Sequence, residues 1–282
     1  MGDCIPHMLE EMPPASVDFA VFSPPFPSLF AYTSEECDIG NSEDLKGEAK
    51  IHMGYFYRGL ARVMKPGRIA MCHVMQIPRL RRTGGRGTHD FRGLNIRMGE
   101  RAGLVWEYDW LVRKNPQAQA IRTHSHSLLF VTLERDRSQT RGALGDYLIK
   151  FTAPGDNAVP IDSPEIGRDE WIEWAEACWD VRETHTLNVT EGRGENDTKH
   201  ICPLQLDVIE RLVKLYSNPG EVVFSPFAGI GSEGYMALML GRKFYGCELK
   251  DEYYRAAEVN FARAIEKRKE LQTDLFTDAG TE

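Results

Sequence analysis

Four consecutive residues combine a hydroxyl group, two rigid rings and an aromatic ring: Ser23-Pro24-Pro25-Phe26. The two prolines fix φ and remove two backbone donors, so the Pro24 carbonyl oxygen projects from a stiff segment with little local competition. This carbonyl and the Ser23 hydroxyl can accept hydrogen bonds from an exocyclic amine, while the Phe26 ring stacks on a planar base. Partners that draw the amine nitrogen towards tetrahedral geometry localise its lone pair for attack on an electrophilic methyl group. The alternative interpretation is a proline-rich strand exit without a chemical role.

A second stretch runs from a β-branched strand over 222–224 through a glycine turn into a helix. Gly229 and Gly231 lack Cβ atoms, so a ligand can approach the backbone there, and the N–H groups that open the helix favour an electron-rich ligand end such as a carboxylate. Glu248 ends the next strand, where an acidic side chain can accept both hydroxyl protons of a ribose. Together these features predict a nucleoside-containing cofactor site. The alternative is a tight strand-to-helix turn followed by a solvent-exposed glutamate.

Charge is distributed unevenly along the chain. The net charge of −8 argues against attraction of the whole surface to nucleic acid. Seven arginines nevertheless lie between residues 79 and 101, against only Asp90 and Glu100. This stretch fits a localised phosphate-binding surface, and it fits a solvated loop equally well.

The elements expected around these stretches alternate between strand and helix, which predicts an α/β sheet. The predicted strands are 17–22, 69–74, 105–112, 127–133, 146–151, 222–224 and 243–247. The predicted helices are 5–12, 53–64, 95–102, 205–216, 233–240 and 253–265, with a frayed tail from 267. In open α/β sheets, ligands bind outside the carboxyl ends of the strands, where Ser23–Phe26 and the glycine turn both fall. Trp171, Trp174 and Trp179 are predicted to pack in the core, with base stacking as the alternative.

Composition places the chain among ordinary globular proteins, with 42% hydrophobic and 27% charged residues in 282. No apolar run reaches the length of a membrane span and no signal peptide is visible at the start, so we expect a cytoplasmic protein without a membrane partner. The six cysteines are scattered without a C-x-x-C pair, which indicates neither a disulfide framework nor a metal site.

Residues 23–26, followed far downstream by 224–231, resemble the amino DNA methyltransferases, which transfer a methyl group from S-adenosylmethionine to cytosine N4 or adenine N6. The order, with the catalytic stretch first and the cofactor stretch last, is similar to the permuted β class of that family. The resemblance spans nearly the whole chain and is strongest to standalone enzymes that phages and prophages encode. It implies one methyltransferase catalytic domain over 1–282, with a Rossmann-like fold of a mostly parallel sheet, helices on both faces and a circularly permuted motif order.

The resemblance also implies roles for individual residues. Ser23, Pro24, Pro25 and Phe26 would hold the target base, with Phe26 stacking on it. The implied cofactor-binding residues are Asp3, Cys4, His200, Cys202, Pro203, Ser225, Phe227, Ala228, Gly229, Gly231, Ser232, Glu248 and Leu249. One position departs from the family pattern of Asp-Pro-Phe, because Ser225 stands where the family has Asp. The carboxylate at the cofactor's ammonium end is therefore missing or replaced.

The identity of the target base follows from the same comparison. Family members with Ser at the first catalytic position mostly methylate cytosine N4, and those with Asp or Asn mostly adenine N6. We therefore expect a cytosine-N4 methyltransferase, with adenine N6 as the alternative. A third hypothesis, motivated by Ser225, is an inactive methyltransferase fold that binds DNA or a nucleotide.

The implied partner is double-stranded DNA, from which the target base must be flipped. We expect residues 79–101 to form a basic DNA-contact loop, since arginine binds phosphate bidentately. The expected DNA-contact residues are Arg79, Arg81, Arg82, Arg86 and Arg92. Residues 122–193 are expected to form a small, irregular target-recognition region with a short recognition sequence. The expected setting is restriction-modification in a bacterial or phage-infected cell, and a homodimer is left open.

Overall fold

The structure is a computed structural model. It describes residues 1–27, 33, 35–42, 47–79, 87–123, 133–139, 142–188 and 203–278. The expected roles of Arg81, Arg82, Arg86, His200 and Cys202, and most of the strand expected over 127–133, lie outside the described residues. Within the described residues, no helix has the length and apolar character needed to cross a membrane.

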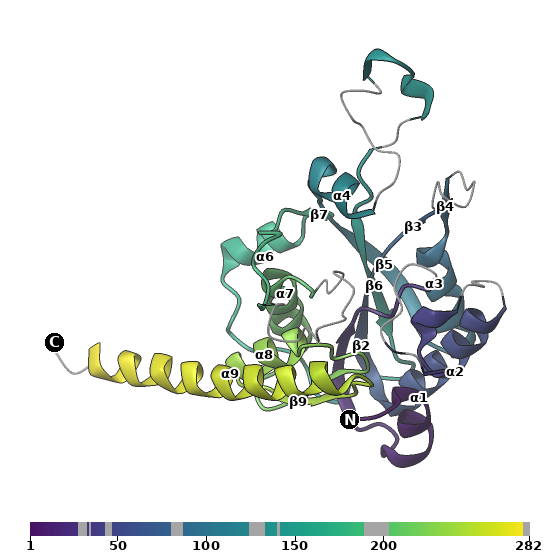
Figure 1. The fold of residues 1–282 in the computed structure, drawn as a ribbon. Helices are drawn as coiled ribbons and strands as arrows, with labels where there is room; N and C mark the ends of the chain where they lie inside the picture. The colour runs from purple at the N-terminus through teal and green to yellow at the C-terminus, as the bar shows by residue number, and fades with distance from the viewer. Residues whose placement is uncertain are drawn as a thin grey trace.

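The described residues form a seven-stranded sheet at the centre of the molecule, in the order β7-β5-β6-β2-β1-β8-β9 (Figure 1). Its strands are β1 (Val17–Phe22), β2 (Met64–Met75), β5 (Val105–Val112), β6 (Asp146–Thr152), β7 (Cys178–Trp179), β8 (Val222–Ser225) and β9 (Lys243–Gly246). Only β6 runs against the others, because it pairs antiparallel with both β2 and β5. The mostly parallel sheet predicted from the sequence is confirmed.

Strand β1 is buried along its whole length, as its run of β-branched and aromatic residues predicts. Phe19 and Val21 pack in one hydrophobic core, and Ala20 and Phe22 pack in the core on the opposite face of the sheet. Helices must therefore cover both faces of the sheet at β1.

Helices do cover both faces of the sheet (Figure 1). The first core joins the sheet to α1 (Cys4–Pro6), the π-helix η1 (His7–Glu11), α2 (Glu48–Val63) and α3 (Phe91–Arg101). The second core joins it to α6 (Arg168–Trp174), α7 (Leu206–Tyr216) and α8 (Ser232–Met239). The last helix, α9 (Asp251–Asp278), packs along α8. The remaining described elements are the 3-10 turns η2 (Ile39–Asn41) and η4 (Arg137–Gln139), the short strands β3 (Ile77–Pro78) and β4 (Thr88–His89), and α4 (Pro116–Thr123).

The chain reverses its winding between β1 and β8, which are neighbours in the sheet. From β1 it passes through α2 to β2 on one side, and from β8 it passes through α8 to β9 on the other. Ala20 lies opposite Phe224, so the segments after these two strands leave the sheet at the same level. Such a switch point opens a crevice at the carboxyl ends of the strands, where α/β proteins bind ligands.

The amino ends of the same strands are tied by one buried carboxylate. Asp18 accepts hydrogen bonds from the Val222 backbone N–H at 2.9 Å and from Lys65 Nζ at 2.5 Å. Buried Arg68 donates to the Asp18 carbonyl oxygen at 2.9 Å and pairs with Glu221. Asp18 therefore joins β1, β2 and β8 at the edge opposite the crevice, which fixes the spacing of the strand ends that form it.

Several boundaries differ from those predicted. Helix α3 begins at Phe91 rather than 95, because the Asp90 carboxylate accepts the Gly93 N–H at 2.8 Å and caps the helix. The stretch 79–101 is a loop only in part, because it also contains β4, which pairs with β3 just before the stretch, and the whole of α3. Helix α9 continues to Asp278, past the fraying expected at 267, since its Glu, Lys and Leu residues are good helix formers.

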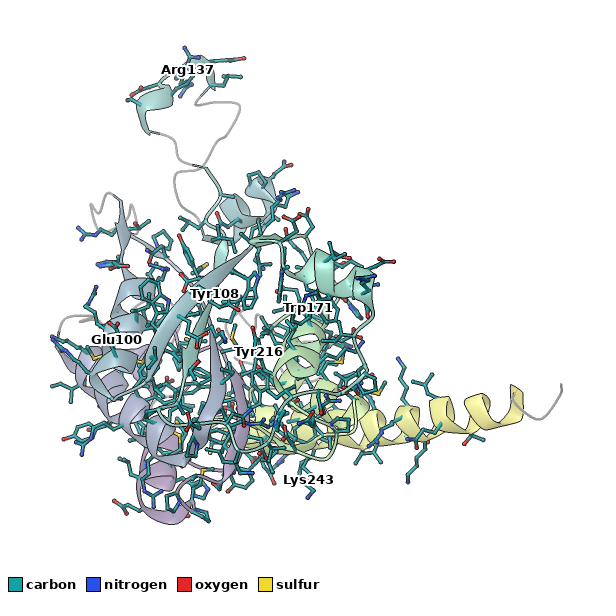
Figure 2. The ribbon with its side chains drawn as sticks, turned by 180° about the vertical axis from the view of Figure 1, so that it is seen from behind. Glu100, Tyr108, Arg137, Trp171, Tyr216 and Lys243 are labelled. Atoms are coloured by element: carbon teal, nitrogen blue, oxygen red, sulfur yellow. The ribbon has the colours of Figure 1, made fainter. Side chains whose placement is uncertain are left out.

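The region 122–193 is also more regular than expected. The strand predicted over 146–151 is confirmed as β6, which lies inside the main sheet, and the region also contains α6 and β7. Trp174 and Trp179 are buried as predicted. Trp171, which is labelled in Figure 2, has 60% of its surface exposed, so the packing prediction is wrong for it. Only the last turn of α6 reaches the core. On the same side of the sheet, the Tyr108 and Tyr216 hydroxyl oxygens lie 3.2 Å apart and join β5 to α7.

Candidate active site

The residues predicted to hold the target base, Ser23–Phe26, are called the base clamp below. They leave the sheet directly after β1. Pro24 is buried, and Ser23, Pro25 and Phe26 are half-buried. The ring centroid of Phe26 lies 5.4 Å from that of Phe91, the first residue of α3. Phe91 therefore supports the Phe26 ring from the protein side, and the exposed part of the ring faces outwards.

A histidine that was not among the residues predicted from the sequence contacts Ser23. His73 lies near the end of β2, one residue beyond Cys72, which is opposite Phe22 in the parallel register. That register brings Ser23 and His73 to the same level, where His73 Nδ1 and Ser23 Oγ are 3.4 Å apart. The polar residue in the apolar strand 69–74 was the available signal, but its partner could not be read from local sequence.

The other ring nitrogen of His73 contacts a buried ion pair. Its Nε2 lies 2.7 Å from Asp146 Oδ2, and Lys114 Nζ lies 2.7 Å from the same oxygen. The side chains of Lys114 and Asp146 are only 7% and 8% exposed. Burial alone would raise the pKa of Asp146, but His73 and Lys114 outweigh it and hold that pKa below its usual value. Asp146 is therefore a carboxylate at neutral pH.

The predicted cofactor residues from opposite ends of the chain meet at the end of β9. The Gly2 N–H donates to the Glu248 carbonyl oxygen at 2.9 Å, and the Ala228 N–H donates to the Cys247 carbonyl oxygen at 2.9 Å. Asp3 follows Gly2 and caps α1 by accepting the Ile5 N–H at 2.9 Å. The structure thus brings Asp3, Cys4, the glycine turn and Glu248 together.

Glu248 is held by backbone donors in a geometry that leaves acceptor capacity. One carboxylate oxygen accepts the Gly229 N–H at 2.7 Å and the other accepts the Lys250 N–H at 2.9 Å. Burial raises the pKa of Glu248, and these backbone bonds partly offset the shift. Each oxygen of the ionised group keeps a further lone pair, which suits two neighbouring hydroxyl groups.

The two glycines of the turn have different reasons to be glycine. Both have positive φ, 52° at Gly229 and 85° at Gly231. A Cβ atom at Gly229 would meet nothing within 4 Å, whereas one at Gly231 would lie 2.6 Å from the Phe261 ring of α9. Gly229 therefore borders open space where a ligand can approach, and Gly231 permits close packing of α9 on the turn.

Two of the buried polar atoms that lack a hydrogen-bond partner among the described residues flank this turn. The Oγ atoms of Ser225 and Ser232 are buried and make no hydrogen bond within the described residues. The Oε1 atom of Gln205, two residues after the predicted cofactor residue Pro203, also has no hydrogen-bond partner among the described residues. Native proteins rarely leave buried polar groups unsatisfied, so these atoms fit a site whose ligand completes them.

A buried carboxyl group that was not predicted lies beside Ser232 in the first turn of α8. Glu233 is 5% exposed, and burial raises its pKa to about 8, with a smaller contribution from the Glu248 carboxylate. Ala237, one turn further along α8, is fully buried, so this face of the helix points into the protein. Glutamate is common in the first turn of a helix, which is why its burial gave no signal in the sequence.

The remaining predicted cofactor residues are less directly placed. Phe227 packs in the core against Phe56, with ring centroids 4.9 Å apart, so its ring stabilises the turn from below. Ala228 is buried, and Pro203 and Leu249 are half-buried. Their contact with a cofactor remains a prediction.

The described arginines of the basic stretch have different surroundings. Arg79 is exposed, and its backbone N–H donates to the Gly87 carbonyl oxygen at 3.1 Å. Arg92 lies in α3, pairs with Asp109, and stacks over Trp106 and Tyr147 at 5.3 Å each. Arg92 is thus engaged within the protein, and its contact with DNA remains a prediction.

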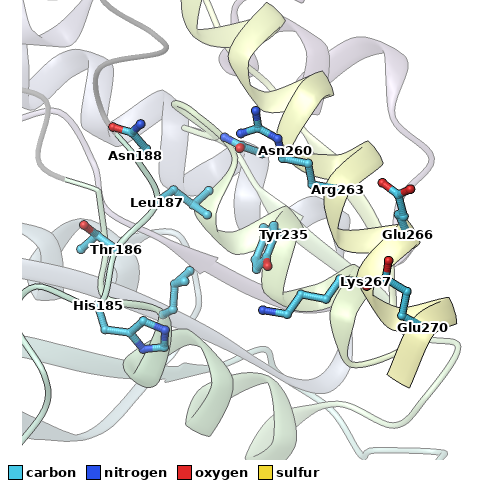
Figure 3. A pocket seen from close by; sticks show the side chains of 11 residues that line it. His185, Thr186, Leu187, Asn188, Tyr235, Asn260, Arg263, Glu266, Lys267 and Glu270 are labelled. Carbon is cyan, nitrogen blue, oxygen red and sulfur yellow. The ribbon is translucent and has the colours of Figure 1, made fainter. Parts of the chain in front are cut away.

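A pocket of about 500 Å³ lies between the segment 185–188, α8 and α9 (Figure 3). Leu187, Tyr235 and Asn260 line it, together with charged residues of α9. Asn260 Nδ2 donates to the Ile230 carbonyl oxygen at 2.9 Å, so one lining residue of the pocket contacts the glycine turn. Its lining includes neither Ser23–Phe26 nor Glu248, which separates it from the crevice.

Comparison with known sequences gives a family match. The model of the DNA methylase family matches residues 17–259. The type II methyltransferase M.BglII of Bacillus subtilis is 32% identical over 107 residues, which are 38% of this chain and 27% of that protein. The DNA adenine methyltransferase YhdJ of Escherichia coli strain K12 is 42% identical over 48 residues, 17% of this chain and 16% of that protein. The aligned segments thus span well under two thirds of these relatives' own lengths.

Solved structures share the fold over nearly the whole chain. TTHA0409 of Thermus thermophilus, assigned as a DNA modification methylase and complexed with S-adenosyl-L-methionine, aligns with a TM-score of 0.69 and 22% identity, over 94% of this chain and 93% of that chain. The cytosine-N4-specific PvuII DNA methyltransferase aligns with a TM-score of 0.64 and 16% identity, over 93% and 84%. These likenesses confirm the α/β methyltransferase fold. With the family match extending over most of its length, this chain belongs to the DNA methylase family.

Proposed function

We propose that this chain is a DNA methyltransferase that transfers a methyl group from S-adenosylmethionine to the exocyclic amine of a flipped base. One observation carries the proposal: Ser23–Phe26 and the turn at 228–231 leave adjacent parallel strands at the same level, with Glu248 bonded to that turn. A base clamp and a nucleoside site then share one crevice. Direct transfer depends mainly on such positioning, and no cysteine nucleophile is needed.

The residues of the crevice fit this cofactor. Glu248 has acceptor sites for a ribose diol, and the open space at Gly229 admits a ligand against the backbone. Ser225 and Ser232 offer buried hydroxyl groups without partners in the described chain for the polar end of the methionine part. When bound, the cofactor supplies an electrophilic methyl group. Because Ser225 lacks the family's carboxylate, we infer that Glu233 provides the negative charge at the ammonium end, since a nearby cation favours the ionised form of a carboxyl group.

Cytosine N4 is the proposed target, and adenine N6 is the alternative. Ser at position 23 favours cytosine within the resemblance described above, and PvuII methyltransferase, which shares the fold, is cytosine-N4-specific. The short match to the adenine methyltransferase YhdJ keeps adenine as the second candidate. The base clamp itself accepts an exocyclic amine from either base.

Double-stranded DNA is the proposed partner, approached from the carboxyl edge of the sheet. The β3–β4 pair follows β2, and α4 follows β5, so both lie beyond that edge (Figure 1). Exposed Arg79 follows β3, and we propose that the 79–101 stretch contacts phosphate there. We propose that target recognition uses the parts of 122–193 other than β6 and β7, because these two strands belong to the main sheet. The remaining part is small, which favours a short recognition sequence.

The proposed function is tested by incubating the full chain with random-sequence duplex DNA and methyl-deuterated S-adenosylmethionine, followed by nucleoside mass spectrometry. N4-methylcytosine is expected. N6-methyladenine would replace the base assignment while keeping the enzyme class. Phe26→Ala is expected to abolish transfer while cofactor binding, measured by calorimetry, is kept. Leu271→Ala, at a 50% exposed position in the C-terminal part of α9, serves as the control variant and should transfer at the wild-type rate.

The alternative of an inactive methyltransferase fold rests on Ser225 in place of the family's Asp. It predicts that wild-type protein binds DNA or a nucleotide but gives no methylated nucleoside. Ser225→Asp then provides a further test, because restored transfer in this variant would identify the missing carboxylate as the cause.

A further inference from the structure

Four side chains form a continuous polar line from the base clamp into the protein. Ser23, His73, Asp146 and Lys114 are joined by contacts of 3.4, 2.7 and 2.7 Å. They come from the ends of β1, β2 and β5 and from the first residue of β6. The antiparallel insertion of β6 between β2 and β5 is what brings Asp146 to this edge.

The hydrogen bonds along this line have a defined direction. Asp146 is ionised and can only accept, so His73 Nε2 carries the proton and donates it. The other nitrogen of a neutral imidazole, Nδ1, then accepts the Ser23 hydroxyl proton. With its proton directed to His73, Ser23 Oγ presents only acceptor lone pairs to the crevice, as a hydrogen on a target amine requires.

Burial distinguishes this line from the other histidine–carboxylate pairs of the described chain. His185 Nδ1 lies 2.5 Å from Asp207 Oδ1, but the His185 side chain is 39% exposed, and Glu11 of the His7–Glu11 pair is 70% exposed. His73 is 13% exposed, and its partners are still more buried. Burying three ionisable groups is costly even when they are paired, so their position beside the base clamp calls for a role.

We propose that His73 orients the Ser23 hydroxyl as an acceptor for the target amine and takes up the amine proton through that hydroxyl, with Asp146 and Lys114 holding the imidazole. This inference rests on the proposed function. As the N–C bond forms, the C–S bond of the methyl donor breaks and its electron pair stays on sulfur. The N–H proton of the amine passes to Ser23 Oγ, the Ser23 hydroxyl proton passes to His73 Nδ1, and Asp146 stabilises the resulting imidazolium. His73 then releases this proton to water.

The proposal requires a neutral imidazole before transfer. Imidazole side chains change charge between pH 5 and 8, and a protonated Nδ1 would donate to Ser23 instead of accepting from it. Among the described residues, the groups in contact with this imidazole are the Ser23 hydroxyl and the Asp146 carboxylate, and Lys114 acts through Asp146. The single-turnover rate is therefore expected to fall about tenfold for each pH unit below the point where the imidazole becomes protonated. This part of the pH profile is called the acid limb below.

A first test needs neither DNA nor cofactor. Nitrogen NMR of the full chain labelled in its histidine rings reports which nitrogen of His73 carries the proton. The expected result at pH 7.5 is a protonated Nε2 and a bare Nδ1, with the Nδ1 signal shifted in Ser23→Ala. A protonated Nδ1, or no response to Ser23→Ala, would overturn the proposal.

The second test compares pH profiles of single-turnover transfer. His73→Asn keeps a side-chain acceptor for Ser23 but cannot take up a proton, so its rate should fall on the order of 10²-fold or more and lose the acid limb. Cofactor affinity should be unchanged. His7→Asn, from the exposed His7–Glu11 pair, should keep both the wild-type rate and the fall in rate at low pH. A wild-type limb in His73→Asn would contradict the proposal.

Two further variants test the proposal independently, in case His73→Asn does not fold. Asp146→Asn removes the negative charge beside the imidazole, so the acid limb should move to lower pH. Lys114→Met removes the positive charge, so the limb should move to higher pH. A purely structural role would move neither limb, and unchanged limbs would defeat this inference alone. If the wild-type protein gave no methylated nucleoside, the proposed function would be wrong. The NMR test would still show whether Ser23, His73 and Asp146 are hydrogen-bonded as described.

Discussion

The two halves of the crevice differ in how their buried polar groups are satisfied. In the half proposed to be catalytic, Ser23, His73, Asp146 and Lys114 are bonded to one another. In the half proposed to bind the cofactor, the Ser225 and Ser232 hydroxyls have no partner within the described residues, and buried Glu233 has its pKa raised to about 8. The catalytic half is therefore assembled by the fold itself, whereas the cofactor half is left for a ligand to complete.

This difference has an energetic consequence. Removing one member of a bonded, buried set leaves the others unpaired, which costs stability. Removing a group that has no partner relieves a cost instead. Removing a buried polar group should therefore lower the free energy of unfolding in the catalytic half, and leave it unchanged or raise it in the cofactor half.

The largest effect is expected from Asp146→Ala. It leaves the Lys114 ammonium group buried without its partner, and breaking a buried pair in this way costs about 3–5 kcal/mol. Urea unfolding of the cofactor-free protein measures the change. Glu107→Ala removes the partner of Lys150 at a carboxylate that is 35% exposed, and should cost under about 1 kcal/mol. Equal losses of stability in the two variants would contradict the expectation that the ion pair of Asp146 and Lys114 is more costly to break than a partly exposed one.

A large effect of opposite sign is expected from Glu233→Gln at high pH. The pKa of Glu233 in the folded protein, about 8, lies above its ordinary value of 4.5, so the fold favours the protonated form. Its contribution to stability is complete below pH 4.5 and is lost as pH rises through 8. The glutamine variant does not titrate. It should match wild type near pH 5 and be more stable at pH 9, by up to a few kcal/mol in urea unfolding.

The opposite pH dependence would contradict the burial of Glu233. A variant less stable than wild type at pH 9 would mean that the ionised carboxylate has a favourable partner. Glu210→Gln, which removes a carboxylate paired with Lys214 on the surface of α7, provides the control for nonspecific charge effects.

Most of the residues proposed for the cofactor half could be identified from local sequence, but only some of those proposed for the catalytic half. Ser23–Phe26, the glycine turn and Glu248 are each defined within a few residues, and strand-end placement follows from the alternating pattern. The contacts from His73 to Asp146 and Lys114 depend on the insertion of β6 between β2 and β5, a long-range register that no local pattern reveals. The early start of α3 depends likewise on Gln76, whose Oε1 accepts the Phe91 N–H at 2.9 Å from a distant position.

A moderate effect should separate the two turn glycines. Gly231→Ala places a Cβ atom 2.6 Å from Phe261 at a φ of 85°, so it should destabilise the protein by about 1–3 kcal/mol. Gly229→Ala adds only the cost of its φ of 52°, about 1 kcal/mol, because its Cβ meets open space. Cofactor affinity, measured by calorimetry on the folded fraction, should fall at least tenfold in Gly229→Ala. Unchanged affinity there would place the ligand away from the turn.

The smallest effect on stability is expected from Ser225→Ala in the cofactor half. Ser225→Ala removes a buried hydroxyl that has no partner in the described chain, so the cofactor-free protein should be unchanged or more stable by under about 1 kcal/mol. The same change removes a group that the ligand completes, so cofactor affinity should fall about fivefold to tenfold. Ser217→Ala is the matched control, because its buried hydroxyl donates to the Val213 carbonyl oxygen at 2.6 Å and accepts from Arg242 at 3.1 Å. It should destabilise the protein without changing affinity, and the opposite responses of two buried serines would separate a group that serves the fold from one that serves the ligand.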